Sequence, residues 1–154
     1  MRLYLVQHGE AHPEEIDRER RLTPKGEEEV RKVARFLAPR GLTVKAIWHS
    51  GKTRARQTAE ILAEAVTAAR GVEARRGLDP KDSVRPVAEE IHAAGEDILI
   101  AGHLPFLARL ASVLVAGGEE TPVVTFRYGC VVALERGEDG RWSVVWMVVP
   151  EILP

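Results

Sequence analysis

Two histidines and one arginine in this sequence each come shortly after an apolar run. His8 follows the run at 2–6, Arg54 comes after the run at 44–48, and His103 follows the run at 97–101. If these runs are parallel strands, their carboxyl ends meet at one edge of a sheet, which is where α/β proteins bind ligands. The three side chains are therefore expected to meet there. Imidazole and guanidinium groups in that arrangement suit an anionic ligand.

Arg54 carries the clearest single indication of an anion. On a helical wheel it lies within about 40° of Thr58, on the apolar stripe that should face the sheet. An arginine there needs a buried carboxylate or an anionic ligand, because an unpaired buried charge is very costly. Considered alone, Arg54 is explained equally well by a structural partner or by a side chain that reaches the rim.

The two histidines are ambiguous when each is considered alone. His103 stands just before a helix start at Pro105, where free N–H groups attract phosphate, but a histidine there is more often a capping residue. His8 is followed by Gly9, which removes a side chain and lets a ligand approach the backbone. Their combination with Arg54 at neighbouring strand ends favours a functional site.

A metal site is a weaker alternative at the same position. His8, Glu10 and His12 are ligand types, but His8 ends a strand and Pro13 follows His12. The helical geometry that brings two histidines together is therefore doubtful. The sequence also lacks a P-loop and the spaced glycines of a dinucleotide site. We expect no metal and no cofactor.

The apolar pattern predicts the elements that would carry this site. Strands are expected at 2–6, 44–48, 72–75 and 97–101, and helices at 23–38, 52–69, 82–94 and 105–115. Thr23 and Pro24 are a typical N-cap and first residue of a helix. Two β-rich runs, 123–135 and 142–149, are joined by a hairpin signal at 137–140. The expected fold is a three-layer α/β/α sandwich whose mostly parallel central sheet has at least one antiparallel strand.

Length and composition limit the classes of protein. With 154 residues, 45% of them apolar, the chain has the size and core of one domain, which we assign to residues 1–154. The formal net charge of -1 gives no reason to expect nucleic-acid binding. The single cysteine, Cys130, excludes an internal disulfide, and no apolar segment approaches the roughly 20 residues of a membrane span. We expect a cytoplasmic protein without membrane association.

Four segments, taken in order, resemble a known family. They are QHGEA at 7–11, RRLTPKGEEEV at 20–30, SGKTRARQTAEIL at 50–62 and GHLPF at 102–106. Together they resemble the histidine phosphatase superfamily, also called phosphoglycerate mutase-like, and within it the small SixA-type phosphohistidine phosphatases. The most specific part is S-x-x-x-R-A-x-Q-T at 50–58. The resemblance implies the phosphoglycerate mutase-like fold and phosphatase activity.

The resemblance also implies roles for the residues that match the family's motifs. His8 would be the nucleophile that is transiently phosphorylated, and Arg54 and His103 would hold the transferring phosphoryl group. No metal would be required. The phosphate or substrate site would also contain Gln7, Gly9, Arg20 and Ser50.

Gln7 departs from the family's pattern, which usually has arginine immediately before the nucleophile. Glutamine offers two N–H donors but no charge, so it cannot replace a bidentate guanidinium. Gln7 either orients a phosphate oxygen or merely caps the strand. Arg20 or Arg21 could supply the missing charge, and Arg20 has the offset that matches the family.

The sequence leaves the general acid and the substrate more open. Glu10, Asp79 or Asp82 could serve as the acid, although Asp79 has the alternative role of a turn residue before Pro80 and Asp82 that of a helix N-cap. The short connections at the sheet edge leave no large cap, so we expect an open site that admits a phosphohistidine-bearing protein and releases inorganic phosphate. The alternatives are a phosphatase of small phosphate esters, and a weak or inactive relative that only binds phosphate or phosphoproteins because of Gln7.

Overall fold

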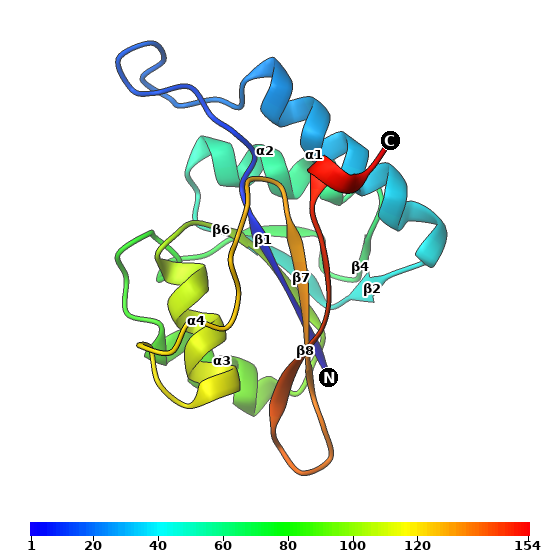
Figure 1. Cartoon of the computed structure of the whole chain (residues 1–154), viewed down its shortest axis with the longest axis vertical. Helices are drawn as coiled ribbons and strands as arrows, with labels where there is room; N and C mark the ends of the chain where they lie inside the picture. Colours follow the sequence, from blue (N-terminus) through cyan, green and yellow to red (C-terminus); the bar gives the residue numbers. More distant parts are fainter.

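Six strands form the central sheet of the computed structural model, which describes residues 1–154. Their order is β5-β3-β6-β1-β7-β8 (Figure 1). Their bounds are Arg2–Gln7 (β1), Ala46–His49 (β3), Val72–Ala74 (β5), Ile98–Gly102 (β6), Val131–Arg136 (β7) and Trp142–Val148 (β8). Neighbouring strands from β5 to β1 are parallel, whereas β7 and β8 are antiparallel to their neighbours. The expected mixed, mostly parallel sheet is confirmed.

Two helices cover each face of this sheet. α1 (Pro24–Leu37) and α2 (Thr53–Leu62) pack on one face, and α3 (Arg85–Ala94) and α4 (Phe106–Ala116) pack on the other (Figure 1). The remaining regular structure is short: η1 (Ala38–Arg40), η2 (Pro150–Ile152), and the paired strands β2 (Thr43–Val44) and β4 (Thr67–Ala68). The three layers are those of the predicted α/β/α sandwich.

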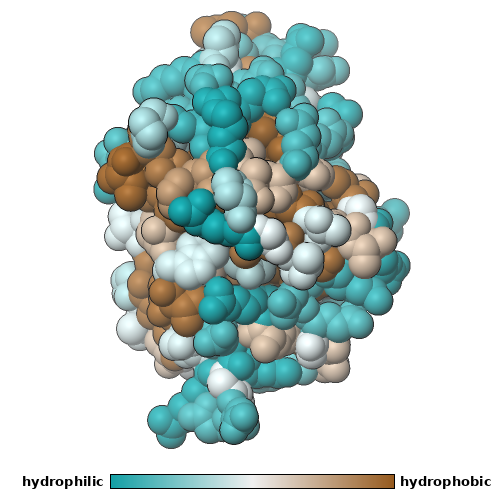
Figure 2. Space-filling model, turned by 90° about the vertical axis from the view of Figure 1, so that its right-hand side faces the viewer, coloured by the Kyte–Doolittle hydropathy of each residue, from teal (hydrophilic) through white to brown (hydrophobic).

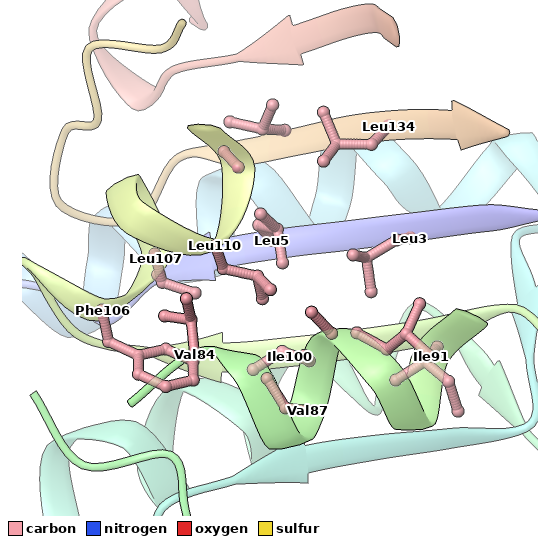
Figure 3. Packing of buried hydrophobic residues seen from close by; sticks show 14 of the residues in the cluster. Leu3, Leu5, Val84, Val87, Ile91, Ile100, Phe106, Leu107, Leu110 and Leu134 are labelled. Atoms are coloured by element: carbon pink, nitrogen blue, oxygen red, sulfur yellow. The ribbon is translucent and has the colours of Figure 1, made fainter. Parts of the chain in front are cut away.

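Side chains of the central strand β1 alternate between two hydrophobic cores. Leu3 and Leu5 belong to the core between the sheet and α3 and α4, where they lie near Ile100 (Figure 3). Tyr4 and Val6 belong to the core on the side of α1 and α2. Because both faces of the strand are covered, it needs a continuous apolar run. Polar and reactive side chains are therefore confined to the end of the strand.

Several element boundaries differ from the sequence-based expectation. The helix expected at 52–69 ends at Leu62, because Val66 enters the core and the next two residues pair with β2. The strand expected at 44–48 is accordingly divided at Lys45 into β2 and β3. The helix expected at 82–94 begins three residues later, because the Asp82 carboxylate accepts a hydrogen bond from the Asp79 N–H at 2.9 Å. These boundaries depend on hydrogen bonds and strand pairing that the apolar pattern does not show.

The first half of the β-rich run expected at 123–135 is not a strand. β7 starts at Val131, which pairs with Val6 near the end of β1. Earlier residues would need a partner beyond that end, where β1 offers none. The chain turns there, and the Gly129 N–H donates to Gln7 O at 3.0 Å and to His8 O at 3.3 Å. This turn therefore lies against the end of β1.

The surface has no extended apolar element. None of the helices is long and apolar enough to cross a membrane. On the face shown in Figure 2, hydrophobic residues form separate patches among hydrophilic ones. Two of the exposed large apolar side chains, Leu104 and Tyr128, lie in the connections after β6 and before β7. Both connections adjoin the carboxyl edge of the parallel strands.

Candidate active site

His8 is the first residue after β1 and lies at the carboxyl edge of the sheet. Its backbone N–H donates to Gly102 O at 3.0 Å, which continues the ladder with β6. Its ring Nδ1 lies 2.7 Å from the carbonyl oxygen of Gly9. A carbonyl oxygen only accepts, so Nδ1 carries the proton and Nε2 keeps its lone pair. The hydrogen bond thus selects the tautomer with a free Nε2.

Burial and positive neighbours keep the His8 imidazole neutral. Burial lowers the pKa of His8 to about 4, and the charges of Arg54 and Arg20 act in the same direction. The hydrogen bond to Gly9 opposes this shift without cancelling it. At neutral pH, His8 therefore presents an unprotonated nitrogen, the form in which an imidazole is a nucleophile.

Gly9 packs closely against helix α1. A Cβ at this position would meet Gly26 O and Val30 Cγ2, each at 2.9 Å. The Gly9 N–H donates to the Thr58 hydroxyl at 3.0 Å, and that hydroxyl donates to Arg54 O at 2.8 Å. The sequence suggested that the missing side chain at Gly9 lets a ligand approach the backbone. In the structure it is α1 that packs closely against Gly9. Thr58, which the sequence interpretation used only to orient Arg54, ties the segment after β1 to α2.

His103 follows β6 and is 1% exposed. Its Nε2 lies 2.7 Å from the Ser50 hydroxyl oxygen, and its ring centroid lies 5.2 Å from that of His8. Burial lowers the pKa of His103 to about 3, and the nearby positive groups, including Arg54, lower it further. The hydroxyl of Ser50, which follows β3, thus forms a hydrogen bond with His103, which follows β6, and orients the His103 ring.

Arg54 lies in the first turn of α2 and has no carboxylate partner. Its Nε is buried without a hydrogen-bond partner, and its guanidinium takes part in no ion pair. Burial lowers the pKa of Arg54, and the charge of Arg20 lowers it further, whereas Asp79 and Tyr128 raise it. From the sequence, Arg54 needed either a buried carboxylate partner or an anionic ligand. The structure contains no such carboxylate partner, which favours the anionic ligand.

Three buried polar atoms at this edge have no partner in the protein. They are Gln7 Oε1, Arg54 Nε and His103 Nδ1, and the one other such side-chain atom is Trp142 Nε1 in β8. Buried polar groups are almost always hydrogen-bonded, so three at one edge mark a place where a ligand completes the bonding. Rotation of the Gln7 carboxamide by 180° exchanges oxygen and nitrogen and offers an N–H at the same point. The arrangement suits an anion with several acceptor oxygens.

Arg20 reaches this edge from the loop before α1. Its backbone has a positive φ of 51°, and its Nε donates to His12 O at 3.1 Å. Its charge lowers the pKa values of both site histidines and of Arg54, as expected for a cation close to all three. Arg21 instead pairs with Asp17 at 3.0 Å on the surface. Of the two arginines considered from the sequence, Arg20 is the one near the site.

Comparison with known families agrees with this geometry. The model of the Histidine phosphatase superfamily (branch 1) matches residues 3–80, which include β1, α1, β3 and α2. The chain belongs to this superfamily. The match contains Gln7, His8 and Arg54, and the chain is accordingly a phosphatase.

Individual relatives cover most of the chain. Phosphohistidine phosphatase SixA of Escherichia coli (strain K12) is 26% identical over 155 residues, which cover 97% of this chain and 94% of the relative. An uncharacterized protein of Picosynechococcus sp. is 36% identical over 124 residues, or 76% of this chain and 74% of the relative. The solved structure of the protein histidine phosphatase SixA complexed with tungstate has a TM-score of 0.86, 25% identity and 99% coverage of both chains. The histidine phosphatase fold thus extends from β1 to β8.

Glu10 and Asp79, two candidates for the general acid of this phosphatase, differ in their surroundings. Glu10 Oε1 accepts from the Thr23 hydroxyl at 2.8 Å, and Glu10 Oε2 lies 4.0 Å from Lys25 Nζ, so Glu10 is tied to the start of α1. The exposed Asp79 makes no side-chain ion pair, and its charge raises the pKa of Arg54. Asp79 is thus the less engaged of the two. No group of three or more His, Cys, Asp or Glu side chains is arranged to hold a metal ion.

Tyr128 is a neighbour of the phosphatase site that the sequence analysis missed. Its ring centroid lies 5.6 Å from that of His8, and the two ring planes make an angle of 40°. The side chain is 47% exposed, whereas His8 is 7% exposed. Tyr128 belongs to no matched motif and stands in a turn that was expected to be strand, so no sequence signal pointed to it.

Proposed function

We propose that this phosphatase forms a covalent phosphohistidine on His8 and hydrolyses phosphohistidine carried by a protein. The observation that carries the proposal is the neutral His8 imidazole beside three buried polar atoms that lack partners. A nucleophile next to unfilled hydrogen-bonding positions is what transfer of a phosphoryl group requires. The substrate class is taken from the relative named phosphohistidine phosphatase SixA.

The proposed reaction has two displacements at phosphorus. In the first, the lone pair on His8 Nε2 forms an N–P bond while the P–N bond of the substrate breaks, and the leaving imidazole nitrogen takes up a proton. In the second, water attacks the phosphorus of phosphorylated His8. The N–P bond breaks, inorganic phosphate leaves, and His8 returns to its neutral form. The Nδ1–H group of His8 stays hydrogen-bonded to Gly9 O throughout, so Nε2 remains the reacting atom.

The remaining site residues act on the phosphoryl oxygens in this scheme. Arg54 and Arg20 stabilise the charge on those oxygens, so no metal ion is needed for that purpose. His103 donates from Nδ1 while Ser50 holds its Nε2. Gln7 contributes an amide N–H without adding charge, and Gly9 carries the carbonyl that orients the nucleophile.

The proposed leaving group makes only a weak demand on the general acid. An imidazole departs readily from phosphorus once its nitrogen is protonated, unlike the alkoxide of a phosphate ester. Asp79 is the better placed donor because it is exposed and close enough to Arg54 to influence its pKa. Glu10 would first have to leave its hydrogen bond with Thr23.

The proposed protein substrate fits the exposure of the site. The chain forms one histidine phosphatase domain over residues 1–154 without a large cap insertion, so a surface loop of another protein can reach the sheet edge. We place this reaction in the cytoplasm, with inorganic phosphate as product and without nucleic acid or membrane as partner.

A comparison of substrates tests the proposal. Purified enzyme should have a much higher kcat/KM for a phosphohistidine-bearing protein than for sugar phosphates, nucleotides or a phosphoserine peptide. The His8→Ala variant, folded as judged by its melting temperature, should be inactive on all of them. Preference for a small ester would support the alternative substrate class. Stoichiometric phosphate binding without turnover would support a binding protein and contradict the proposal.

A further inference from the structure

The turn that carries Tyr128 is anchored directly to the nucleophile's segment. The Gly129 N–H donates to the carbonyl oxygens of Gln7 and His8 at 3.0 and 3.3 Å, and Cys130 N donates to Arg127 O at 3.1 Å. Gly129 has a positive φ of 73°, which suits glycine at this point of a turn. These hydrogen bonds fix the turn relative to the end of β1. They hold Tyr128 next to that end, and its ring centroid lies 5.6 Å from that of His8.

The ring stands at the mouth of the site, not at its floor. His8 and His103 are 7% and 1% exposed, whereas Tyr128 is 47% exposed. Of the exposed large apolar side chains, Tyr128 is the one aromatic residue. A substrate that reaches His8 passes the open face of this ring. The other exposed large apolar side chain at the same edge, Leu104, is aliphatic and cannot offer a flat face.

The geometry of displacement decides which part of a substrate meets Tyr128. The reacting atoms approach to about 3–3.5 Å, and the leaving group departs on the side of phosphorus opposite the nucleophile. Because His8 forms the floor, the leaving group points outward toward the mouth. The centroid of the Tyr128 ring lies 5.6 Å from that of His8, so a leaving group on the outer side of phosphorus is within reach of the ring. The phosphoryl oxygens, by contrast, face Arg54 and His103.

We propose that the exposed face of Tyr128 stacks against the leaving imidazole of the phosphohistidine substrate and so favours flat, ring-containing leaving groups. This inference rests on the function proposed above and adds no covalent step to it. Stacking suits this role because two flat rings gain contact area with little loss of conformational freedom. The interaction selects the leaving group and not the phosphoryl group, which all phosphate compounds share.

Two small donors isolate the contribution of the ring. N-phosphoimidazole and phosphoramidate both contain a P–N bond, but only the first has a ring to stack. We expect Tyr128→Ala and Tyr128→Leu to lower kcat/KM for N-phosphoimidazole by about 3- to 10-fold, the range of a single aromatic contact. The same variants should change kcat/KM for phosphoramidate less than about 2-fold. Tyr128→Phe should keep the wild-type ratio, because it retains the ring.

The ratio of the two kcat/KM values is the decisive quantity, since it does not depend on how much of a variant is folded. An unchanged ratio in Tyr128→Ala overturns the inference. So does a Tyr128→Leu ratio equal to that of Tyr128→Phe, because any apolar side chain would then suffice. A lower ratio in Tyr128→Phe would assign the effect to the hydroxyl and also overturn it. If the wild type forms no phosphohistidine at His8 from a phosphohistidine-bearing protein, the proposed function itself fails.

Discussion

At the scale of single residues, the site places Arg54 and Arg20 beside two neutral histidines, and none of the four side chains makes an ion pair. Arg54 has no ion-pair partner, and burial lowers the pKa values of Arg54, His8 and His103 alike. Removing water from such groups costs free energy in the empty enzyme. A bound oxyanion supplies the missing acceptors, so the stability of the empty enzyme and its affinity for oxyanions are coupled through these side chains.

The neutral state of His8 predicts a specific loss of stability in acid. Its pKa is about 4 in the folded protein against 6.5 in the unfolded chain. The unfolded state therefore binds the proton first, and stability is lost as pH falls from 6.5 through 4. Between pH 7.5 and 4.5 the wild type should lose about 2 kcal/mol more free energy of unfolding than His8→Asn, which cannot titrate there.

Denaturant unfolding of both proteins at the two pH values measures this difference. All carboxylates are common to both proteins, so their titration cancels in the comparison. Equal losses in the wild type and in His8→Asn would show that His8 is not held neutral by burial.

Gln7 offers a second prediction at this scale. Gln7 is 8% exposed, and its Oε1 has no hydrogen-bond partner in the protein. Gln7→Arg would add a charge-assisted contact to a phosphoryl group, worth about 1.5–3 kcal/mol. We expect tighter inhibition by phosphate and vanadate with at most a modest gain in kcat, because a contact present in ground and transition states alike does not speed the reaction.

Gln7→Met is the matched control for this substitution, since it keeps the length of the side chain and removes the amide. It should weaken inhibition by both anions. Inhibition constants that stay unchanged in folded Gln7→Arg and Gln7→Met variants would mean that position 7 does not face the phosphoryl group.

At the scale of elements, contacts between neighbouring segments position the reactive atoms. Ser50 after β3 holds His103 after β6, and Thr58 in α2 holds Gly9 after β1. The start of α1 closes against the same segment, because Gly26 lies under the backbone of Glu10. The site is therefore as rigid as the packing of these helices on the sheet edge.

A methyl group at Gly26 tests this packing. A Cβ there would lie 2.1 Å from Glu10 O, a contact that only a backbone shift can relieve. Gly26→Ala should cost about 1–3 kcal/mol of stability, as overpacking does, and should lower activity by moving the segment that carries His8. Gly118→Ala is the control, because a Cβ at that position meets nothing within 4 Å.

Thermal unfolding and phosphatase assays of the two variants measure the outcome. A Gly26→Ala enzyme as stable and as active as Gly118→Ala would mean that the start of α1 does not position the segment that carries His8.

The sequence predicted the main helices and strands better than it predicted where they begin and end. The apolar runs and the Thr23 cap indicated the sheet and α1, because these signals are local. The predicted end of α2 and the predicted start of β7 were wrong, because both depend on a partner strand. After α2, β4 pairs with β2, and β7 can begin only where β1 ends, near Val131. His8, Arg54 and His103 were singled out because each follows a strand. Tyr128 was missed because its turn is fixed by hydrogen bonds to residues that are far away in the sequence.

At the scale of the whole molecule, one sheet edge collects the chemistry of segments that are distant in sequence. Parallel strands β3, β6 and β1 end side by side, so three separate connections deliver Ser50, His103 and His8 to one place. The antiparallel strand β7 returns from the turn that adds Tyr128. A net charge of -1 means that attraction for anions is local to this edge.

Trapping the covalent intermediate tests the central claim most directly. The enzyme is mixed for a short time with a ³²P-labelled phosphohistidine protein, quenched in alkali, and digested to locate the label. We expect label on His8 that is stable in base and labile in acid, together with release of labelled phosphate, and no label in His8→Ala. Turnover without label on His8, or equal labelling of His8→Ala, would contradict it.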